Sequence, residues 1–279
     1  MDVSIIVPFY EGNEYISRII DMVNINAKIN KDLDVELILV NDSPWNDIHL
    51  PNDDFGFHIS VLKDSENAGI HGARVKGLKA ASGNYVLMLD QDDIITDDFI
   101  TKSYNLIGDA DVCVSNGILH RQQGDKPIYL NLKKHNLINN LFSYVYLENR
   151  ILSPGQCLMK KKSIPEEWIN CTMDKNGADD LVLWILMLCQ GRHFVVNNDY
   201  LYEHIDTGKN VSSDELNMAA STLEACSYLK NVSYVPHWIP IVLKRKTQND
   251  VFYIKTGKDK FLDYKMIEIA RKRLGRSRN

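Results

Sequence analysis

Residues 85–98 read YVLMLDQDDIITDD, and this stretch decides the predicted fold. An apolar run ending at Leu89 leads directly into three carboxylates, which are Asp90, Asp92 and Asp93. A short apolar run that follows a glycine-asparagine turn is typical of a strand buried on both faces, as in parallel sheets. The acids then lie at the carboxyl end of the strand, where open α/β sheets bind ligands.

Two interpretations of these acids are open from the stretch alone. Carboxylates about two residues apart at a strand end can converge on one hard cation such as Mg²⁺ or Mn²⁺. Alternatively, Asp92 and Asp93 form a polar turn and cap the helix that follows. Asp97 and Asp98 are expected to be ordinary helix-start acids.

Strand and helix patterns alternate through the first part of the chain. Apolar residues at helical spacing follow the first strand, and a second helix is predicted from Ala68. The alternation predicts an α/β fold with a central, mostly parallel sheet flanked by helices and joined by right-handed crossovers. The strands are predicted at residues 3–8, 35–40, 58–62, 85–89 and 110–115.

Local signals predict how some of these elements end and what one helix buries. The helix from Ala68 is expected to end near Gly83 in left-handed geometry. Thr96 and Ser163 are expected to cap the helices that follow them. Arg74 falls on the apolar stripe of its helix, so it either pairs with an acid at the strand ends or faces a phosphate.

The pattern becomes less regular in the second half of the chain. A helix-like run at 137–147 is rich in Tyr and Phe. A short strand is predicted at 157–159, a helix at 178–189 and another strand at 193–196. A largely helical tail is expected from Asp214 onward.

Composition excludes extreme classes of protein. The chain has 279 residues, of which 44% are hydrophobic and 25% charged, as in ordinary soluble globular proteins. A formal net charge of −5 argues against nucleic-acid binding, although bases outnumber acids from Lys255 onward.

Cysteine usage and hydropathy bear on the compartment. The five cysteines are scattered and never spaced as metal-ligand pairs, which fits a reducing cytosol. No apolar run approaches the roughly 20 residues that span a bilayer. Because Met1-Asp2 leads directly into a strand, no signal peptide is expected. The expected location is cytoplasmic, either free or bound peripherally to the inner face of the cell membrane.

Three groups of acids follow predicted elements. Asp42 follows the second strand, the Asp90 group follows the strand at 85–89, and Asp179-Asp180 begin a helix. Taken alone, Asp42 is interpreted as a turn former and Asp179-Asp180 as helix caps. Because Asp42 and Asp90 both follow buried strands, we expect them along one edge of one sheet.

Five segments stand in a characteristic order along the chain: VSIIVPFYEGNEYI, LILVNDSP, ENAGIHGARVKGLKAASGNYVLMLDQDD, GADDLVLWILML and LYEHIDTGKNVSS. In this order they resemble the family 2 glycosyltransferases, which have the GT-A fold. The resemblance spans about residues 3–213. It implies a GT-A domain at 1–213, with a nucleotide-binding half at 1–115 and an acceptor-binding half at 116–213. A helical C-terminal extension is expected at 214–279.

The resemblance implies residues that bind a nucleotide-sugar donor, expected to be a UDP-sugar. Asp42 matches the acid that contacts the uracil ring in uridine-dependent members, and Asp90 is expected on the ribose side. The other matching positions are Pro8, Tyr10, Glu11, Asn67, Gly69, Arg74, Gln91 and Asp92.

The resemblance also implies a metal-assisted, inverting sugar transfer. Asp92, Asp93 and His204 match positions near the metal-diphosphate, and oxygen ligands favour Mn²⁺ or Mg²⁺ over zinc. Asp179-Asp180 match the pair whose acid is the catalytic base, and the second place in the pair favours Asp180. A carboxylate opposite the leaving group can take the proton of an acceptor hydroxyl.

Several positions depart from the family pattern. Asn41 stands where the family often has Asp, Asp179 stands where Glu is common, and Lys76 replaces a frequent Asn. These departures put the base preference in doubt and leave the expected fold unchanged. Ser212 matches a closing segment that lies with His204 near the diphosphate.

The acceptor side is defined less well. Ser153, Gly155 and Gln156 are expected to line the mouth that faces a glycan, glycolipid or glycoprotein acceptor. The aromatic run with Phe142, Tyr144 and Tyr146 either stacks on sugar rings or belongs to an ordinary amphipathic core helix.

Two C-terminal segments combine apolar residues with clustered bases, and they read VPHWIPIVLKRK and KMIEIARKRLGRSRN. Such segments can lie on an anionic membrane surface. A solvated basic tail is the alternative interpretation.

The predicted function is a glycosyltransferase that moves a hexose or N-acetylhexosamine onto a surface polysaccharide or glycoconjugate. A sugar nucleotidylyltransferase is one alternative, and it should have a Gly-rich loop with a basic residue after the first strand. The loop here, PFYEGNEY, is acidic and has no Lys or Arg before Arg18. A non-catalytic nucleotide- or glycan-binding protein is the other alternative, and it would tolerate the loss of Asp180.

Overall fold

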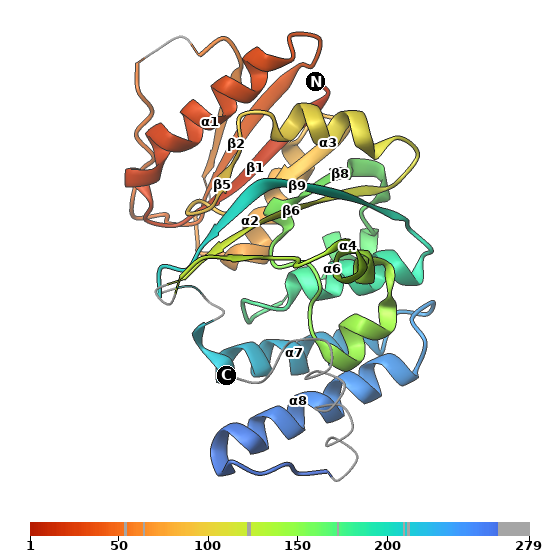
Figure 1. The fold of residues 1–279 in the computed structure, drawn as a ribbon. Helices are drawn as coiled ribbons and strands as arrows, with labels where there is room; N and C mark the ends of the chain where they lie inside the picture. The colour runs from red at the N-terminus through yellow and green to blue at the C-terminus, as the bar shows by residue number, and fades with distance from the viewer. Residues whose placement is uncertain are drawn as a thin grey trace.

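The protein is built around one mixed β-sheet, seen in the computed structural model of Figure 1. The structure describes residues 1–52, 55–63, 65–121, 124–171, 173–208, 210 and 213–261. Neighbouring strands in the sheet follow the order β3-β2-β1-β4-β8-β6-β9-β5, and β7 pairs with β6. Ser212 and the basic segment 265–279 lie outside the described residues.

The first half of the sheet is parallel, as the sequence predicts. It contains β1 (Val3–Phe9), β2 (Val35–Asn41), β3 (His58–Lys63) and β4 (Tyr85–Met88). Every residue of β1 and β2 is buried, which is why both strands read as nearly continuous apolar runs. Their parallel pairing places the carboxyl ends of β1, β2 and β4 at one edge.

The second half of the sheet is mixed. β8 (Cys157–Lys160) runs antiparallel between β4 and β6 (Val112–His120). β9 (Phe194–Ile205) runs parallel to β6, and its irregular register between Ser115 and Gly117 marks a bulge. The short strands β5 (Ile94–Ile95) and β7 (Lys126–Pro127) pair with β9 and β6.

Both β6 and β9 extend well past the strands that the sequence predicts. The extra residues are mostly polar, so an apolar run does not mark them. The extension matters because β9 returns to the loop after β4 and pairs there with β5. It also carries β6 across residue 115, so both expected halves of the GT-A domain share one sheet.

Helices cover both faces of the sheet. α1 (Ile16–Ile29) and α3 (Phe99–Ile107) pack on one face, which Ile5 of β1 also joins. α2 (Gly69–Ala80) and α6 (Asp179–Cys189) pack on the other face, which Ile6 of β1 joins. α7 (Glu215–Leu229) and α8 (Trp238–Thr256) form a further layer beyond α6 (Figure 1).

Short elements connect the sheet to these outer helices. The predicted helix at 137–147 is divided into a 3₁₀ turn, η2, and a π-helix, η3. The bounds of the short elements are η1 Asn13–Tyr15, α4 Leu132–His135, η2 Asn136–Asn139, η3 Ser143–Leu147, η4 Pro154–Gln156, η5 Lys161–Ser163 and α5 Glu166–Ile169.

Three local predictions were wrong. α2 ends at Ala80, and Gly83 does not adopt left-handed geometry; a Cβ there would lie 2.7 Å from the backbone nitrogen of Ser4. Thr96 does not cap α3, because its hydroxyl donates to Asp98. Ser163 does not cap α5, because its hydroxyl donates to Asp111 at 2.6 Å.

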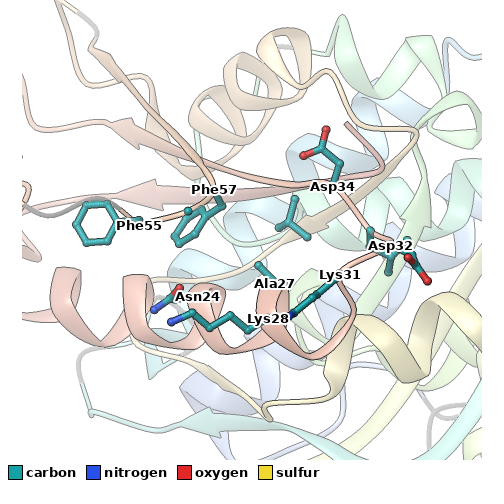
Figure 2. Close-up of a pocket in the computed structure, with 11 residues that line it drawn as sticks. Asn24, Ala27, Lys28, Lys31, Asp32, Asp34, Phe55 and Phe57 are labelled. Carbon is teal, nitrogen blue, oxygen red and sulfur yellow. The ribbon is translucent and has the colours of Figure 1, made fainter.

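A cavity of about 440 Å³ lies at the amino end of β2 (Figure 2). Phe55 and Phe57 line it on one side and Ala27 and Lys28 of α1 on another. The acids of the sequence motifs follow the carboxyl ends of the strands. This cavity therefore lies at the opposite ends of the strands from them.

All five cysteines are free thiols, and four of them are buried. Within the part of the chain that the structure describes, no helix has the length and apolar character needed to cross a bilayer.

Candidate active site

The predicted donor residues gather at the carboxyl ends of β1, β2 and β4. Asp42 follows β2, is buried, and its backbone N–H donates to the Phe9 carbonyl at the end of β1 (2.8 Å). Pro8 is buried near the end of β1 beside Val40 of β2. Asp90 follows β4 at the same edge. The expected juxtaposition of Asp42 and Asp90 along one edge therefore occurs.

Arg74 links this edge to the start of α6. Its Nη2 atom lies 2.6 Å from Asp90 Oδ1, and its Nη1 atom lies 2.7 Å from Asp179 Oδ2. Burial alone would lower the pKa of the guanidinium, but Asp90 and Asp179 raise it above its ordinary value. Of the two predicted roles of Arg74, pairing with acids is the one seen. The Ser153 hydroxyl donates to Asp90 Oδ2 at 3.0 Å, so both Asp90 oxygens have partners.

Asp179 and Asp180 occupy different environments. Asp179 is 2% exposed and is held by Arg74, whereas Asp180 is half-buried. Asn149 Nδ2 donates to Asp180 Oδ2 at 2.7 Å, and the Leu181 N–H donates to Oδ1 at 2.6 Å. Burial, and then the charge of Asp179, raise the pKa of Asp180 to about 8. The two acids therefore differ in burial and in their partners.

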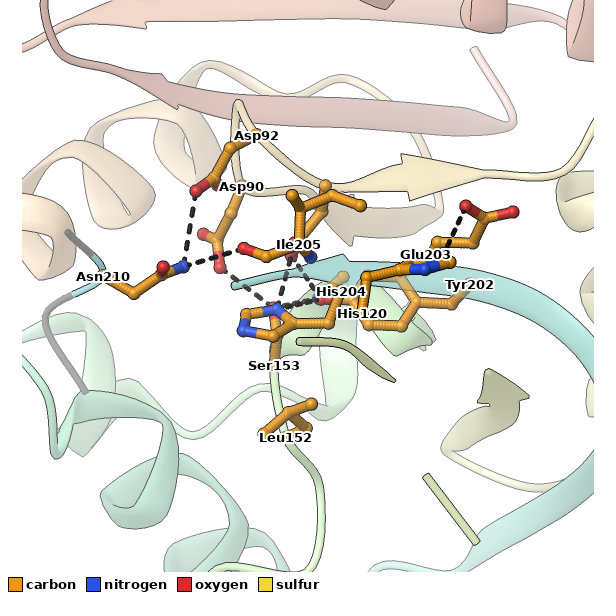
Figure 3. Close-up of polar contacts among 12 residues, drawn as sticks. Asp90, Asp92, His120, Leu152, Ser153, Tyr202, Glu203, His204, Ile205 and Asn210 are labelled. Carbon is orange, nitrogen blue, oxygen red and sulfur yellow. Dashed lines mark hydrogen bonds and ion pairs between the residues drawn. The ribbon is translucent and has the colours of Figure 1, made fainter. Parts of the chain in front are cut away.

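Asp93 forms a cluster with His204 and Tyr202, two side chains of β9 that Figure 3 labels. His204 Nδ1 lies 3.0 Å from Asp93 Oδ1, which also accepts from the Ile205 N–H at 3.2 Å. The Tyr202 hydroxyl donates to Asp93 Oδ2. Burial alone would lower the pKa of His204, but Asp93 raises it above its ordinary value. Asp93 therefore holds the end of β9 against the loop after β4.

Asp92 is more accessible than its neighbour Asp93. It is half-buried, and Asn210 Nδ2 reaches its Oδ2 atom at 3.4 Å while also donating to the Ile205 carbonyl (Figure 3). Burial, followed by the charges of Asp93 and Asp90, raises the pKa of Asp92 to about 6. A nearby positive charge would stabilise the ionised form of this carboxyl group, whose neighbours are negatively charged.

The expected metal ligands do not form a complete cage. Among the described residues, no group of three His, Cys, Asp or Glu side chains could hold a metal ion. Asp93 is fully buried and both its oxygens have partners, so it does not fit a ligand role here. Asp92 does fit, because Mg²⁺ and Mn²⁺ bind through one or two carboxylates and complete their shell with substrate phosphates and water.

The loop after β1 is held by side chains that sequence reasoning placed on the nucleotide. The Gln91 carboxamide accepts from the Tyr10 N–H at 2.9 Å and donates to the Tyr10 carbonyl at 3.0 Å. Glu11 has a left-handed φ of 48° and accepts from the Trp45 indole N–H at 2.6 Å. Tyr10 and Trp45 are 48% and 61% exposed, with ring centroids 5.9 Å apart. Gln91 thus supports the loop that presents these two rings.

Asn67 and Gly69 form the turn that leads into α2. Asn67 Nδ2 donates to the Asp42 carbonyl at 2.9 Å, and Asp42 Oδ1 accepts from the Ala68 N–H at 2.6 Å. Gly69 has a φ of 72°, which L side chains rarely adopt. A Cβ there would also lie 2.6 Å from Asn176 Oδ1. The turn therefore fixes Asp42 relative to the start of α2.

The predicted acceptor residues lie in the turn η4, and all three are buried. Ser153 reaches Asp90, and a Cβ at Gly155 would lie 3.0 Å from the Tyr202 ring. Gln156 is fully buried; its carboxamide accepts from the Leu152 N–H and donates to the Ser115 carbonyl. The structure therefore places Gln156 inside the protein and not on a surface that faces an acceptor.

Sequence reasoning did not identify four residues that contact the predicted site: Trp45, Asn149, Tyr202 and Asn210. Tyr202 and Asn210 lie inside the motif LYEHIDTGKNVSS, so that motif was a usable signal for both. Asn149 contacts an acid 31 residues away, and no local pattern marks it.

Residues 4–168 match the sequence model of the family described as Glycosyl transferase family 2. The matched region is more than half of the chain and contains the loop after β1, Asp42, Arg74 and the acids after β4. The chain therefore belongs to glycosyltransferase family 2.

Two curated relatives share part of the sequence. Glycosyltransferase GlyA of Streptococcus pneumoniae is 31% identical over 118 residues, which cover 41% of this chain and 16% of GlyA. Poly(ribitol-phosphate) beta-glucosyltransferase of Bacillus spizizenii is 25% identical over 213 residues, which cover 74% of this chain and 32% of the relative. The chain thus spans well under half the length of either relative.

A solved structure shares the whole fold. The S. aureus protein TarS, residues 1–349, in complex with UDP-GlcNAc, superposes with a TM-score of 0.59 at 14% sequence identity. The match covers 98% of this chain and 78% of that one. The mixed sheet, its flanking helices and the C-terminal helices therefore form a GT-A-type fold.

Proposed function

We propose that this chain is an inverting glycosyltransferase that moves a hexose or an N-acetylhexosamine from a UDP-sugar to a glycan or lipid-linked acceptor. The observation that carries this proposal is the buried Arg74, which joins Asp90 at the donor edge of the sheet to Asp179 beside Asp180. A donor-binding edge and a candidate base are thereby fixed next to each other.

Asp180 has the properties that the base of such a reaction needs. The acceptor oxygen attacks the anomeric carbon as the bond from that carbon to the diphosphate oxygen breaks, and the acceptor proton passes to a carboxylate. A base is most effective when its pKa lies near the working pH, and the pKa of Asp180 is raised to about 8. Asn149 orients the accepting carboxylate by donating to Oδ2. Displacement from the opposite face inverts the anomeric configuration.

Asp92 would hold the divalent cation that we expect to act with the donor. When bound, Mn²⁺ or Mg²⁺ supplies positive charge that stabilises the departing diphosphate. The described residues offer one accessible carboxylate and no complete cage, which fits a cation that arrives with its nucleotide.

The nucleotide and the acceptor are supported by different comparisons. A UDP donor is supported by the fold shared with TarS in its UDP-GlcNAc complex and by the fixed position of Asp42. A surface-polymer acceptor is supported by the Bacillus relative, whose name places poly(ribitol-phosphate) in its reaction. Tyr10 and Trp45 are exposed rings at the donor edge, where a nucleobase can stack.

The test is release of the nucleoside diphosphate from UDP-GlcNAc, UDP-glucose and UDP-galactose with Mn²⁺, first alone and then with glycan acceptors. We expect wild-type protein to release UDP from at least one donor and Asp180→Asn to bind UDP but transfer no sugar. Normal transfer by Asp180→Asn would refute the base assignment. UDP binding without turnover of any donor by the wild type would favour a non-catalytic binding protein.

A further inference from the structure

Three aromatic rings form a cluster between η3 and α8, and one of them, Phe142, is exposed. Phe142, Tyr146 and Trp238 are nearly parallel, with interplanar angles of 15–25°. Their centroids are 5.1 Å apart for Phe142 and Trp238, 6.1 Å for Phe142 and Tyr146, and 6.0 Å for Tyr146 and Trp238. A column of three rings would place its outer members twice as far apart as neighbours. The similar separations therefore indicate a stepped aromatic surface, called here the aromatic platform.

Phe142 is the exposed ring of the platform, whereas Tyr146 and Trp238 are partly buried and pack against the hydrophobic core. Phe142 is 60% exposed, and Ile241, one turn after Trp238 on α8, is 65% exposed. Tyr144, on the intervening position of η3, is fully buried and donates to the Ile138 carbonyl. The sequence left open whether this aromatic run is core or surface; the structure turns Tyr144 inward and leaves Phe142 outward.

The platform is joined to the candidate base by a short segment of chain. Tyr146 precedes Asn149 by three residues, and Asn149 Nδ2 donates to Asp180 Oδ2 at 2.7 Å. Three extended residues span at most about 10 Å, so the Cα atoms of Tyr146 and Asn149 lie within that distance of each other. The segment is fixed to α8, because Lys246 Nζ donates to the Leu147 carbonyl at 2.8 Å. The segment η3 is a π-helix. π-Helices are rare in proteins, and those that occur are often found at functional sites.

We propose that the aromatic platform is an acceptor subsite that stacks against the C–H faces of a pyranose ring, a short distance from the hydroxyl that reacts at Asp180. This inference rests on the proposed transferase function. Flat, nearly parallel rings suit the flat apolar face of a sugar. The Tyr146 hydroxyl and the Trp238 indole N–H add hydrogen-bonding groups at the edge of the platform for sugar hydroxyls.

The charges around the platform favour a glycan over a lipid surface. Membrane-surface segments present clustered bases beside their apolar residues. Here Lys246 is buried and donates to Leu147, and the Arg245 guanidinium packs over the Phe261 ring. This part of α8 therefore does not present its three consecutive bases together as one surface.

Binding to immobilised pyranose oligosaccharides of two to six residues tests this subsite, with Phe142→Ala and the double variant Phe142→Ala, Trp238→Ala beside wild type. We expect the wild type to bind at least one oligosaccharide and the double variant to bind it about tenfold more weakly. Phe142→Ala alone removes an exposed ring and should weaken binding in the same direction. Phe252→Ala, an exposed aromatic elsewhere on α8, is the matched control and should bind as wild type does.

Two results would overturn the subsite. One is equal oligosaccharide binding by wild type and double variant, or no binding by either. The other is a loss in the double variant confined to phosphatidylglycerol vesicles, which would assign the platform to a membrane. UDP binding and UDP release by wild type are measured on the same samples. If these persist while the platform variants behave as wild type, the subsite fails alone; if wild type lacks both, the proposed function fails.

Discussion

At the scale of single residues, the site depends on which carboxylates are already paired. Asp90 and Asp179 share one guanidinium, and Asp93 is bonded to Tyr202 and His204. These partners lie at least 16 residues away in sequence. The apolar stripe of α2 indicated that Arg74 could pair with an acid, but no local pattern shows which acids have partners. Asp92 at the donor edge and Asp180 at the base position are half-buried and accept hydrogen bonds from neutral side chains, Asn210 and Asn149. The division of roles among five acids follows from their partners and not from their spacing.

Replacement of Arg74 should destabilise the protein strongly. Arg74→Met leaves the carboxylates of Asp90 and Asp179 without their cation in a buried position, which costs about 3–5 kcal/mol. Arg74→Lys should lose less than Arg74→Met because it keeps a positive charge beside the acids, but it should still lose stability because one ammonium cannot fork between both acids. The measurement is urea unfolding at neutral pH.

Arg192→Met is the matched control for Arg74. Its partner Asp111 is 3.6 Å away and Arg192 is 37% exposed, so the loss should stay below about 1 kcal/mol. Equal losses for Arg74→Met and Arg192→Met would show that the Arg74 bridge is not a major stabilising contact.

Asn149→Ala should shift the pH dependence of sugar transfer. The hydrogen bond from Asn149 favours the ionised form of Asp180, so its removal raises the pKa of Asp180 further. Since the base acts as a carboxylate, the rate rises with pH through that pKa, and the rise should move upward by about one pH unit. The measurement is kcat/KM against pH, with the exposed Asn170→Ala as control. A uniform loss at every pH, with no shift of the rise, would mean that Asn149 has only a structural role.

At the scale of elements, the sequence predicted the presence of strands and helices better than it predicted how they end. Apolar spacing marks buried parallel strands and amphipathic helices, so β1, β2, β4 and α6 were predicted within one or two residues. The predicted helix caps were wrong because a hydroxyl near the start of a helix can donate its hydrogen bond to a side chain instead of capping the helix. Ser163 bonds to Asp111, 52 residues away. β9 was predicted too short because the polar run at 197–199 interrupts its apolar pattern.

Gly69→Ala should weaken nucleotide binding beyond its effect on stability. Left-handed geometry at φ 72° costs about 1–2 kcal/mol for a residue with a Cβ, and this Cβ would also meet Asn176 Oδ1 at 2.6 Å. Because Gly69 follows the turn that holds Asp42, the strain displaces the donor edge. UDP affinity by calorimetry and thermal unfolding are measured together.

Gly191→Ala separates the two effects. Gly191 has a similar φ of 75°, but nothing lies within 4 Å of its Cβ position, and it follows the far end of α6. Both variants should lose stability, and only Gly69→Ala should lose UDP affinity. Unchanged affinity in Gly69→Ala would separate the α2 turn from nucleotide binding.

At the scale of the whole molecule, one sheet joins donor and acceptor sides. β8 and β6 extend the parallel strands, and β9 returns from β6 to the loop after β4. The outer helices continue this arrangement, because α8 contacts the segment that leads from η3 to Asn149. A change at the C-terminal helices can therefore reach the candidate base through a few direct contacts.

UDP and Mn²⁺ should stabilise the whole protein together and not separately. Asp92 alone offers a cation too few ligands, and a diphosphate alone meets the acids at the end of β4. The cation neutralises the acids and the diphosphate completes the shell of the cation, so the two ligands should bind together. Ligands that bind only the folded protein stabilise it. At a hundredfold excess over Kd the gain is about 2.7 kcal/mol, which raises Tm by several degrees. Differential scanning fluorimetry measures the shift, with GDP and CMP plus Mn²⁺ as controls. Equal shifts with those nucleotides would remove the uridine preference, and no shift with UDP plus Mn²⁺ would remove the donor assignment.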